Sequence, residues 1–111
     1  MTISTTTLKN AARAIECDLW TDPATGANYL AKDGAILRRW EPATDHGDSF
    51  CLMVALGLDV LNDQSSATVK KFDSFNQRVV AMYTEYDGKR DSRAMLAILQ
   101  CAAQIGAKLC Q

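Results

Sequence analysis

The sequence predicts an α+β fold in which three helices pack on a small antiparallel sheet, in an α/β/α sandwich-like arrangement. Apolar residues recur with helical spacing near both ends of the chain, and short period-two patterns bounded by turn residues lie between them. The chain has 111 residues, of which 48% are apolar. This size suits a single domain over residues 1–111, because a second domain would be too small to bury a core of its own.

The first helix is predicted from Thr5 to about Glu16. Its apolar residues recur at intervals of three and four, as an amphipathic surface helix requires: Leu8, Ala11, Ala12 and Ile15. The Asp-Gly pair at 33–34 then favours a hairpin turn between two short strands, 28–31 and 35–39.

A second helix is predicted between an N-cap at Thr44 or Asp45 and a C-cap at Gly57. Apolar residues fill most of its circumference. A helix that is apolar on nearly all sides is typically buried on more than one side. We therefore expect this helix to be the most central element of the fold.

Two strands and a third helix complete the prediction. Residues 67–72 are predicted as a strand near a sheet edge, because Lys70 and Lys71 are typical of edges. Residues 77–86 alternate with period two and are largely apolar on both faces, which predicts a strand covered on both sides. The final helix begins at Asp91 or Ser92, and its apolar stripe consists of Met95, Ile98, Leu99, Ala102, Ile105 and Leu109.

Motifs for catalysis, nucleotides and metals are missing from the sequence. The six glycines form neither a GxGxxG nor a P-loop pattern, and the four cysteines form no CxxC pair. We interpret Cys51 and Cys101, which lie in apolar runs, as core residues, and Cys110 as a source of accidental disulfides. The sequence predicts a protein that is not an enzyme and that uses no cofactor or metal.

Two groups of ionisable residues nevertheless need an interpretation. The single histidine, His46, lies between Asp45 and Asp48, and we interpret the three as a helix N-terminus rather than a metal site, since adjacent side chains diverge there. We interpret Glu85 and Asp87 as a solvated strand end rather than a general acid and base.

The aromatic residues of the irregular N-terminal half are the candidate interaction residues. Trp20, Tyr29 and Trp40 are either anchors of a small satellite core or interface residues, and anchoring is favoured because the hairpin has little else to hold it. Arg38 and Arg39 lie beside Trp40 and complete the candidate set.

Basic residues gather in three groups: Arg38 and Arg39; Lys70 and Lys71; Lys89, Arg90 and Arg93. On one face they would suit a nucleic acid. The net charge of −1 argues against this function, because nucleic-acid affinity depends on a surplus of positive charge.

The chain begins without the basic and apolar regions of a secretory signal. Its longest uncharged stretch, between Arg93 and Lys108, is shorter than the roughly 20 apolar residues that span a bilayer. We expect a cytoplasmic protein that does not enter a membrane.

The segment Trp40-Glu-Pro-Ala-Thr-Asp45, followed by the apolar helix to Gly57, resembles the phage ABA sandwich domain family of small bacteriophage and prophage proteins. Ala97-Ile-Leu-Gln-Cys-Ala-Ala103 loosely matches the Ala-rich last helix of that family. The sequence departs from the family at Phe50, where members carry Trp, and in the charged connection 87–91. The resemblance implies an α/β/α sandwich, a phage or prophage origin and no catalytic residues.

The leading hypothesis is a non-catalytic accessory protein that acts in the host cytoplasm by contact with a host or phage protein. We also expect homo-oligomers, formed through the final helix or the strand at 67–72. A nucleic-acid-associated module using the three basic groups is the alternative. A third hypothesis is a small ligand-binding or sequestering protein, with a pocket in which Asp45, His46 or Glu85 meets aromatic walls.

Overall fold

A computed structural model of the chain describes residues 3–73, 75 and 77–109. These residues form three α-helices, α1 (Thr5–Ala14), α2 (His46–Leu56) and α3 (Arg90–Leu109). They also form six strands: β1 (Asp18–Thr21), β2 (Asn28–Lys32), β3 (Ala35–Arg39), β4 (Asp59–Asn62), β5 (Ala67–Asp73) and β6 (Arg78–Glu85). The predicted α+β class with three helices and antiparallel strands is confirmed.

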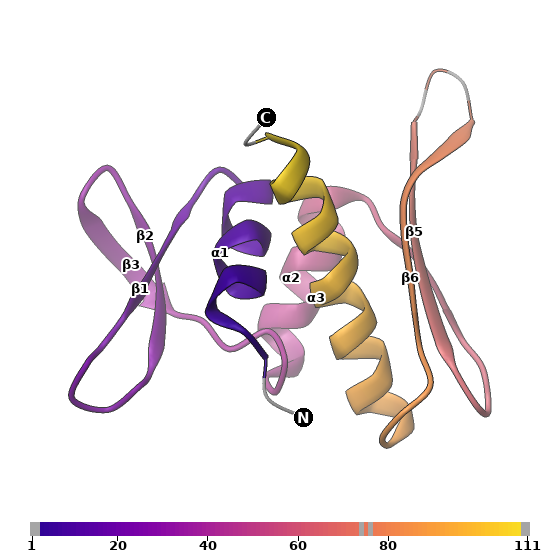
Figure 1. The fold of residues 1–111 in the computed structure, drawn as a ribbon, viewed down its shortest axis with the longest axis horizontal. Coiled ribbons are helices and arrows are strands. Elements are labelled where there is room, and N and C mark those ends of the chain that lie inside the picture. Colours follow the sequence, from indigo (N-terminus) through magenta and orange to yellow (C-terminus); the bar gives the residue numbers. More distant parts are fainter. Residues whose placement is uncertain (1–2, 74, 76, 110–111) are drawn as a thin grey trace.

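The strands form two three-stranded antiparallel sheets where the sequence predicted one. The N-terminal sheet has the order β1-β2-β3, and the C-terminal sheet has the order β4-β5-β6. The three helices lie between the two sheets (Figure 1). Each sheet is a meander whose consecutive strands pair through short turns, and α2 separates the two meanders along the chain.

The helix α3 is the central element. Its buried side chains are mostly small or aliphatic: Met95, Ala97, Ile98, Leu99, Cys101, Ala102 and Ala103. α1 packs against one side of α3, and β5 and β6 pack against the other. The expectation that the second predicted helix would be central is wrong, because the small residues of α3 let two layers approach it closely.

The backbones of α1 and α3 touch at Gly106. A Cβ atom at this position would lie 1.6 Å from the carbonyl oxygen of Asn10, a distance far too short for two non-bonded atoms. Leu8, Ala11 and Ala12 of α1 are also buried. Glycine is therefore required here by the distance between the helices.

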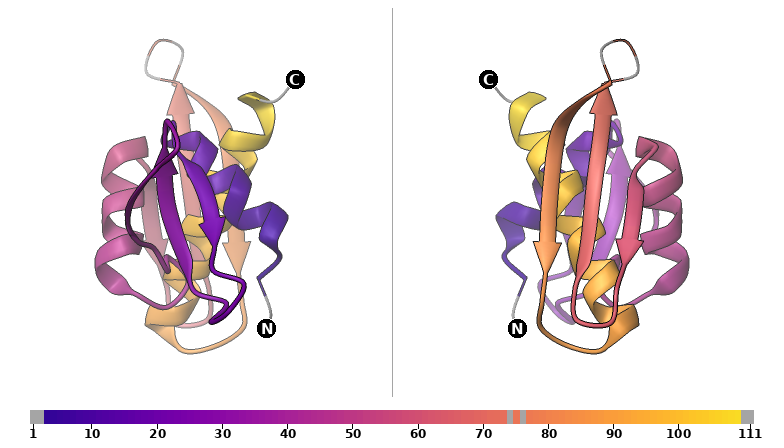
Figure 2. Two further views of the ribbon diagram at one scale, coloured as in Figure 1. Left: turned by 90° about the vertical axis from the view of Figure 1, so that its left-hand side faces the viewer. Right: turned by 90° about the vertical axis from the view of Figure 1, so that its right-hand side faces the viewer.

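The C-terminal sheet buries one face. Ala67 and Val69 of β5 and Ala81 and Glu85 of β6 are buried, whereas Met82 of β6 is exposed. β5 is the central strand of this sheet and β6 is an edge strand, as Figure 2 shows. Both predictions for these strands are wrong: the lysines of residues 67–72 do not mark an edge, and residues 77–86 are covered on one face only.

Side chains of α3 cover the free edge of β6. The Gln104 amide donates to the Met82 carbonyl at 2.8 Å and accepts from the Met82 N–H at 3.1 Å. Lys108 donates to the Val80 carbonyl. These bonds satisfy backbone groups that an uncovered edge would offer to another strand.

The N-terminal sheet is mostly exposed. Every residue of β3 is exposed, and Leu30 of β2 is buried. β1 approaches α1. This sheet contributes little to the core. In the part of the chain that the structure describes, no helix is long and apolar enough to cross a membrane.

Candidate interaction surface

Trp40 is an anchor and not a surface residue. Trp40 is 1% exposed and belongs to the main core, and its backbone N–H donates to the Asn28 carbonyl at 2.8 Å. The buried ring holds the end of β3 against the helices. Trp40 is therefore not available to contact a partner.

Trp20 and Tyr29 form a partly exposed aromatic pair on the N-terminal sheet. They lie opposite each other on β1 and β2, with ring centroids 5.5 Å apart and ring planes tilted by 51°. Trp20 is 41% exposed. Paired aromatic rings of this kind stabilise the two strands and leave part of the indole open to contact.

A polar network joins the N-terminal sheet to α2. The Arg38 guanidinium pairs with Oδ1 of Asp48, whose Oδ2 accepts from the Glu41 N–H at 2.8 Å. The Glu41 carboxylate accepts in turn from the Asn28 backbone and amide. Asp45 is the N-cap and accepts from the Asp48 N–H at 2.9 Å, so the predicted cap at Thr44 or Asp45 is confirmed at Asp45.

An open cavity of about 520 Å³ lies over this network, lined by Arg38, Arg39, Glu41, Thr44, Asp45 and Asp48. Three carboxylates and two guanidinium groups line it, and one guanidinium is already paired. The lining has a net negative charge, which does not suit a phosphate group.

His46 contacts α3 rather than the cavity. Its Nε2 is 3.1 Å from Oδ2 of Asp91, and this hydrogen bond holds the pKa of the Asp91 carboxyl below its ordinary value. Among the described residues, no three His, Cys, Asp or Glu side chains are placed to hold a metal ion.

The outer face of α2 is apolar and exposed. We define this face by Phe50, Cys51, Val54 and Ala55, and Phe50 and Val54 are 60% and 59% exposed. No charged residue occurs from Ser49 to Leu58. The expectations that this helix is buried on more than one side, and that Cys51 is a core residue, are both wrong, whereas Cys101 is fully buried as predicted.

Apolar side chains are also exposed on an edge strand of each sheet. α2 lies at one side of the helical layer (Figure 2). Leu61 of β4 is exposed, and so are Ile36 and Leu37 of β3, the strand that Arg38 links to α2. An exposed apolar helix face is typical of a protein-binding surface.

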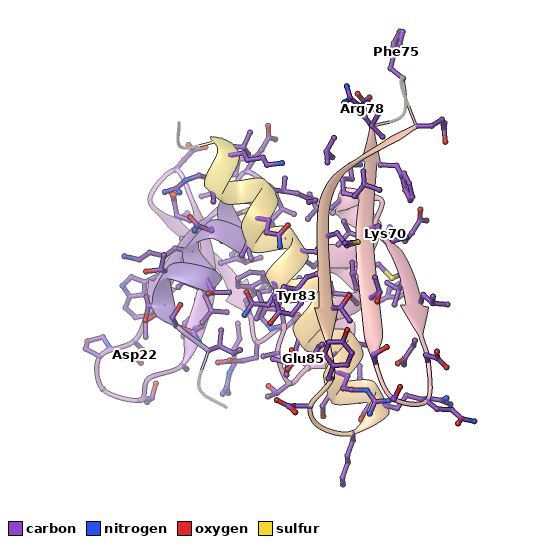
Figure 3. The ribbon with its side chains drawn as sticks, turned by 45° about the vertical axis from the view of Figure 1, so that its right-hand side comes forward. Asp22, Lys70, Phe75, Arg78, Tyr83 and Glu85 are labelled. Atoms are coloured by element: carbon purple, nitrogen blue, oxygen red, sulfur yellow. The ribbon has the colours of Figure 1, made fainter. Side chains whose placement is uncertain are left out.

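The three basic groups do not form one face. Arg38 and Arg39 lie on the N-terminal sheet, and Lys70 lies on the C-terminal sheet, on the opposite side of the helices (Figures 1 and 3). Lys71 donates to the Leu56 carbonyl at 2.7 Å, at the end of α2. The structure therefore does not bring the basic groups together.

Arg93 is also unavailable to a nucleic acid. It is buried, and its guanidinium donates to the carbonyls of Gly88, Asp63 and Gln64. It thereby ties the loop after β4 to the turn before α3. Lys89 in that turn and Arg90, the first residue of α3, remain exposed.

Sequence reasoning missed the environment of Glu85, which is buried and not a solvated strand end. The period-two alternation already placed Glu85 in phase with Ala81 and Tyr83. The signal was therefore present, but the Asp-Gly turn that follows outweighed it.

The fold and this surface define a small α+β domain with a helical layer between two sheets and one exposed apolar helix. A scan against protein-family models and searches of curated proteins and of solved structures found no match to the chain. The resemblance to the phage ABA sandwich domain family therefore stays a prediction.

Proposed function

We propose that this protein is a non-catalytic accessory protein that acts by protein–protein contact, and that the outer face of α2 is its contact surface. The observation that carries the proposal is the exposure of Phe50 and Val54 on a helix face without charges. Exposing such a face to water is costly, and a partner that covers it gains about 25 cal/mol for each Å² of apolar area removed from water.

The first partner that this face fits is a second copy of the chain. Asp45 is exposed at the N-terminal end of α2, and Lys71 binds the Leu56 carbonyl at the C-terminal end. Two copies of α2 packed antiparallel about a two-fold axis bring each acidic end beside the basic end of the other copy. The helix dipoles are then also opposed, which is favourable.

The proposed dimer contact differs from the two oligomer contacts that the sequence predicted. The final helix is largely buried in its own chain, and the strand at 67–72 is the centre of its sheet. Neither offers a free surface for a second copy. The outer face of α2 replaces both as the proposed contact.

A host or phage protein is the further partner of the assembled dimer, and the setting is the host cytoplasm. The three described cysteines, Cys17, Cys51 and Cys101, are unpaired, as is usual in a reducing compartment. The phage or prophage origin is supported by the sequence resemblance of the segment from Trp40 to Gly57.

Analytical ultracentrifugation over a range of concentrations tests the dimer. We expect the wild-type chain to dimerise and Val54→Glu to remain monomeric, because the substitution buries a charge in the contact. Met82→Glu is the matched control, since Met82 is an equally apolar and half-exposed side chain on β6, away from α2. Circular dichroism establishes that both variants are folded.

Cysteine chemistry tests the geometry of the same dimer. Cys51 is the middle residue of α2, so an antiparallel pair of helices places the two Cys51 side chains next to the two-fold axis. In a Cys110→Ser background, mild oxidation should link two chains through Cys51, and Cys51→Ser or Val54→Glu should abolish the link. A wild-type monomer at high concentration, or a dimer that only Met82→Glu dissociates, would overturn the proposal.

A further inference from the structure

A second cavity, separate from the outer face of α2, lies where the N-terminal ends of the three helices meet. Its volume is about 340 Å³. Ile3 before α1, Ala43 before α2 and Leu96 of α3 supply its apolar walls. The remaining lining includes Glu85 and Asp87, at the end of β6, and no lysine or arginine. The cavity is thus apolar along its walls and doubly acidic at one side.

Glu85 is the unusual residue of this cavity. Its side chain is 6% exposed and lies on the same side of β6 as Tyr83, the side that faces α3 (Figure 3). Oε2 accepts from the Tyr83 hydroxyl at 3.3 Å, but Oε1 is buried and receives no hydrogen bond from any described residue. A buried carboxylate oxygen without a donor costs folding free energy, and such atoms are rare in native proteins.

The charged and titratable groups around Glu85 do not supply the missing donor. Arg93, a buried cation of the same region, donates from its two terminal nitrogens to backbone carbonyls, whereas its Nε has no acceptor among the described residues, and it forms no ion pair with Glu85. Tyr83 is engaged by Oε2, and burial raises its pKa, which the negative charges of Glu85 and Asp87 raise further. Tyr83 therefore stays a neutral phenol beside the carboxylate.

We propose that this cavity binds a primary ammonium group on a short aliphatic stem. The ammonium donates to the Glu85 carboxylate, and Asp87 supplies a second negative charge at the same side of the cavity. Ile3, Ala43 and Leu96 contact the methylene groups of the stem. The volume is at the lower end of the range for small-molecule sites, which suits a stem of a few carbons.

Two kinds of molecule carry such an ammonium group: a free aliphatic amine and the lysine side chain of a protein partner. Titrations followed by ¹H–¹⁵N NMR distinguish them, with 1,4-diaminobutane and Nα-acetyl-lysine methylamide as the two probes. Butanol and butyrate are the matched neutral and anionic controls. Both ammonium probes should shift the amide signals of Glu85, Gly88 and Ser92, and the controls should not. The probe that binds more tightly identifies the source.

Two variants establish that Glu85 receives the ammonium. Glu85→Gln keeps the size of the side chain and removes the charge, so affinity for both probes should fall at least tenfold. Glu16→Gln changes an exposed carboxylate at the end of α1 and should leave affinity unchanged. Leu96→Phe, which fills the cavity without altering Glu85, should also abolish binding and carries the test if Glu85→Gln does not fold.

Three results would overturn the proposal. These are no shift with either ammonium probe, equal shifts with butanol, or full binding by a folded Glu85→Gln variant. Because the cavity and the outer face of α2 are separate surfaces, Val54→Glu should bind the probes as the wild type does. The proposal of an ammonium site in the cavity is therefore tested independently of the proposed dimer.

Discussion

The two sheets of this protein have the same three-stranded antiparallel order and are attached to the helices in different ways. The C-terminal sheet packs on α3 along β5 and β6 and buries Ala67, Val69 and Ala81 against it. The N-terminal sheet buries Leu30, and every residue of its last strand is exposed. One sheet is therefore part of the core, and the other is held at its margin.

The difference shows what attaches a sheet when its strands do not carry one continuous apolar face. In β5 and β6 buried or partly buried residues recur at every second position over residues 67–71 and 81–85, so this part of each strand is attached by burial. In the N-terminal sheet the attachment is concentrated in Trp40, which follows β3, and in the network of Arg38, Asp48 and Glu41. A few residues therefore attach the N-terminal sheet to the helices, whereas a buried face attaches the C-terminal sheet.

The close contact between α1 and α3 is one of the two places where a single change should have the largest effect. Gly106→Ala would place a Cβ within 1.6 Å of the Asn10 carbonyl and force α1 away from α3. We expect the free energy of unfolding to fall by about 3 kcal/mol or more, measured by urea denaturation, because backbone cannot move aside as a side chain does.

Gly47→Ala is the control for this prediction. The Cβ that it adds meets a side-chain oxygen of Asp45 at 3.2 Å rather than backbone. Its effect should stay within about 1 kcal/mol, since a residue with better helix propensity partly compensates the contact. If both substitutions lowered the free energy of unfolding equally, the close contact between α1 and α3 would not be the cause of the Gly106→Ala effect.

The two tryptophans of the N-terminal half should differ sharply. Trp40→Ala empties a fully buried site and should lower the free energy of unfolding by about 3–5 kcal/mol. Trp20→Ala removes a half-exposed ring paired with Tyr29 and should cost less than about 1 kcal/mol. Thermal or urea unfolding measures both, and a similar cost for the two would mean that Trp40 is not the principal anchor.

Weakening the polar network between the N-terminal sheet and α2 should lower the free energy of unfolding by an intermediate amount. Asp48→Asn weakens the contact with Arg38 and the acceptor for the Glu41 N–H. We expect a loss of about 1–2 kcal/mol, because Arg38 is half exposed and the ion pair is screened by solvent. Hydrogen exchange should show faster opening of β3 and unchanged protection of β5. Equal acceleration in both sheets would contradict a link that is specific to the N-terminal sheet.

The smallest effect is expected at the contact between the N-terminal ends of α2 and α3. The hydrogen bond from His46 lowers the pKa of Asp91 in the folded protein. The stabilisation is therefore complete above the ordinary carboxyl pKa and is lost as the pH falls through the lowered value. His46→Gln should move the pKa of Asp91 toward 3.8, as carboxyl NMR titration would show. An unchanged pKa would rule out the histidine as its cause.

The helices were predicted well because their signals are local. Spacing, the Asp45 cap and the Gly57 cap, whose φ is 61°, placed α2, and the apolar stripe placed α3. The grouping of the strands was not predicted, because alternation tells which residues share a face and not which strands share a sheet. The sequence predicted Asp45 as an N-cap residue. It did not predict the burial of Glu85, because the turn that follows Glu85 indicated a strand end exposed to solvent.

The amino-acid sequence alone determined the α+β class, the three helices and the turns, since these depend on spacing and on residues with restricted backbone preferences. Only the tertiary structure decided that α3 rather than α2 is central, and that Phe50 and Cys51 face outward while Glu85 faces inward. A helix that is apolar on all sides fits either place, and the competition was settled by Gly106 and the small residues of α3, which let other layers approach more closely.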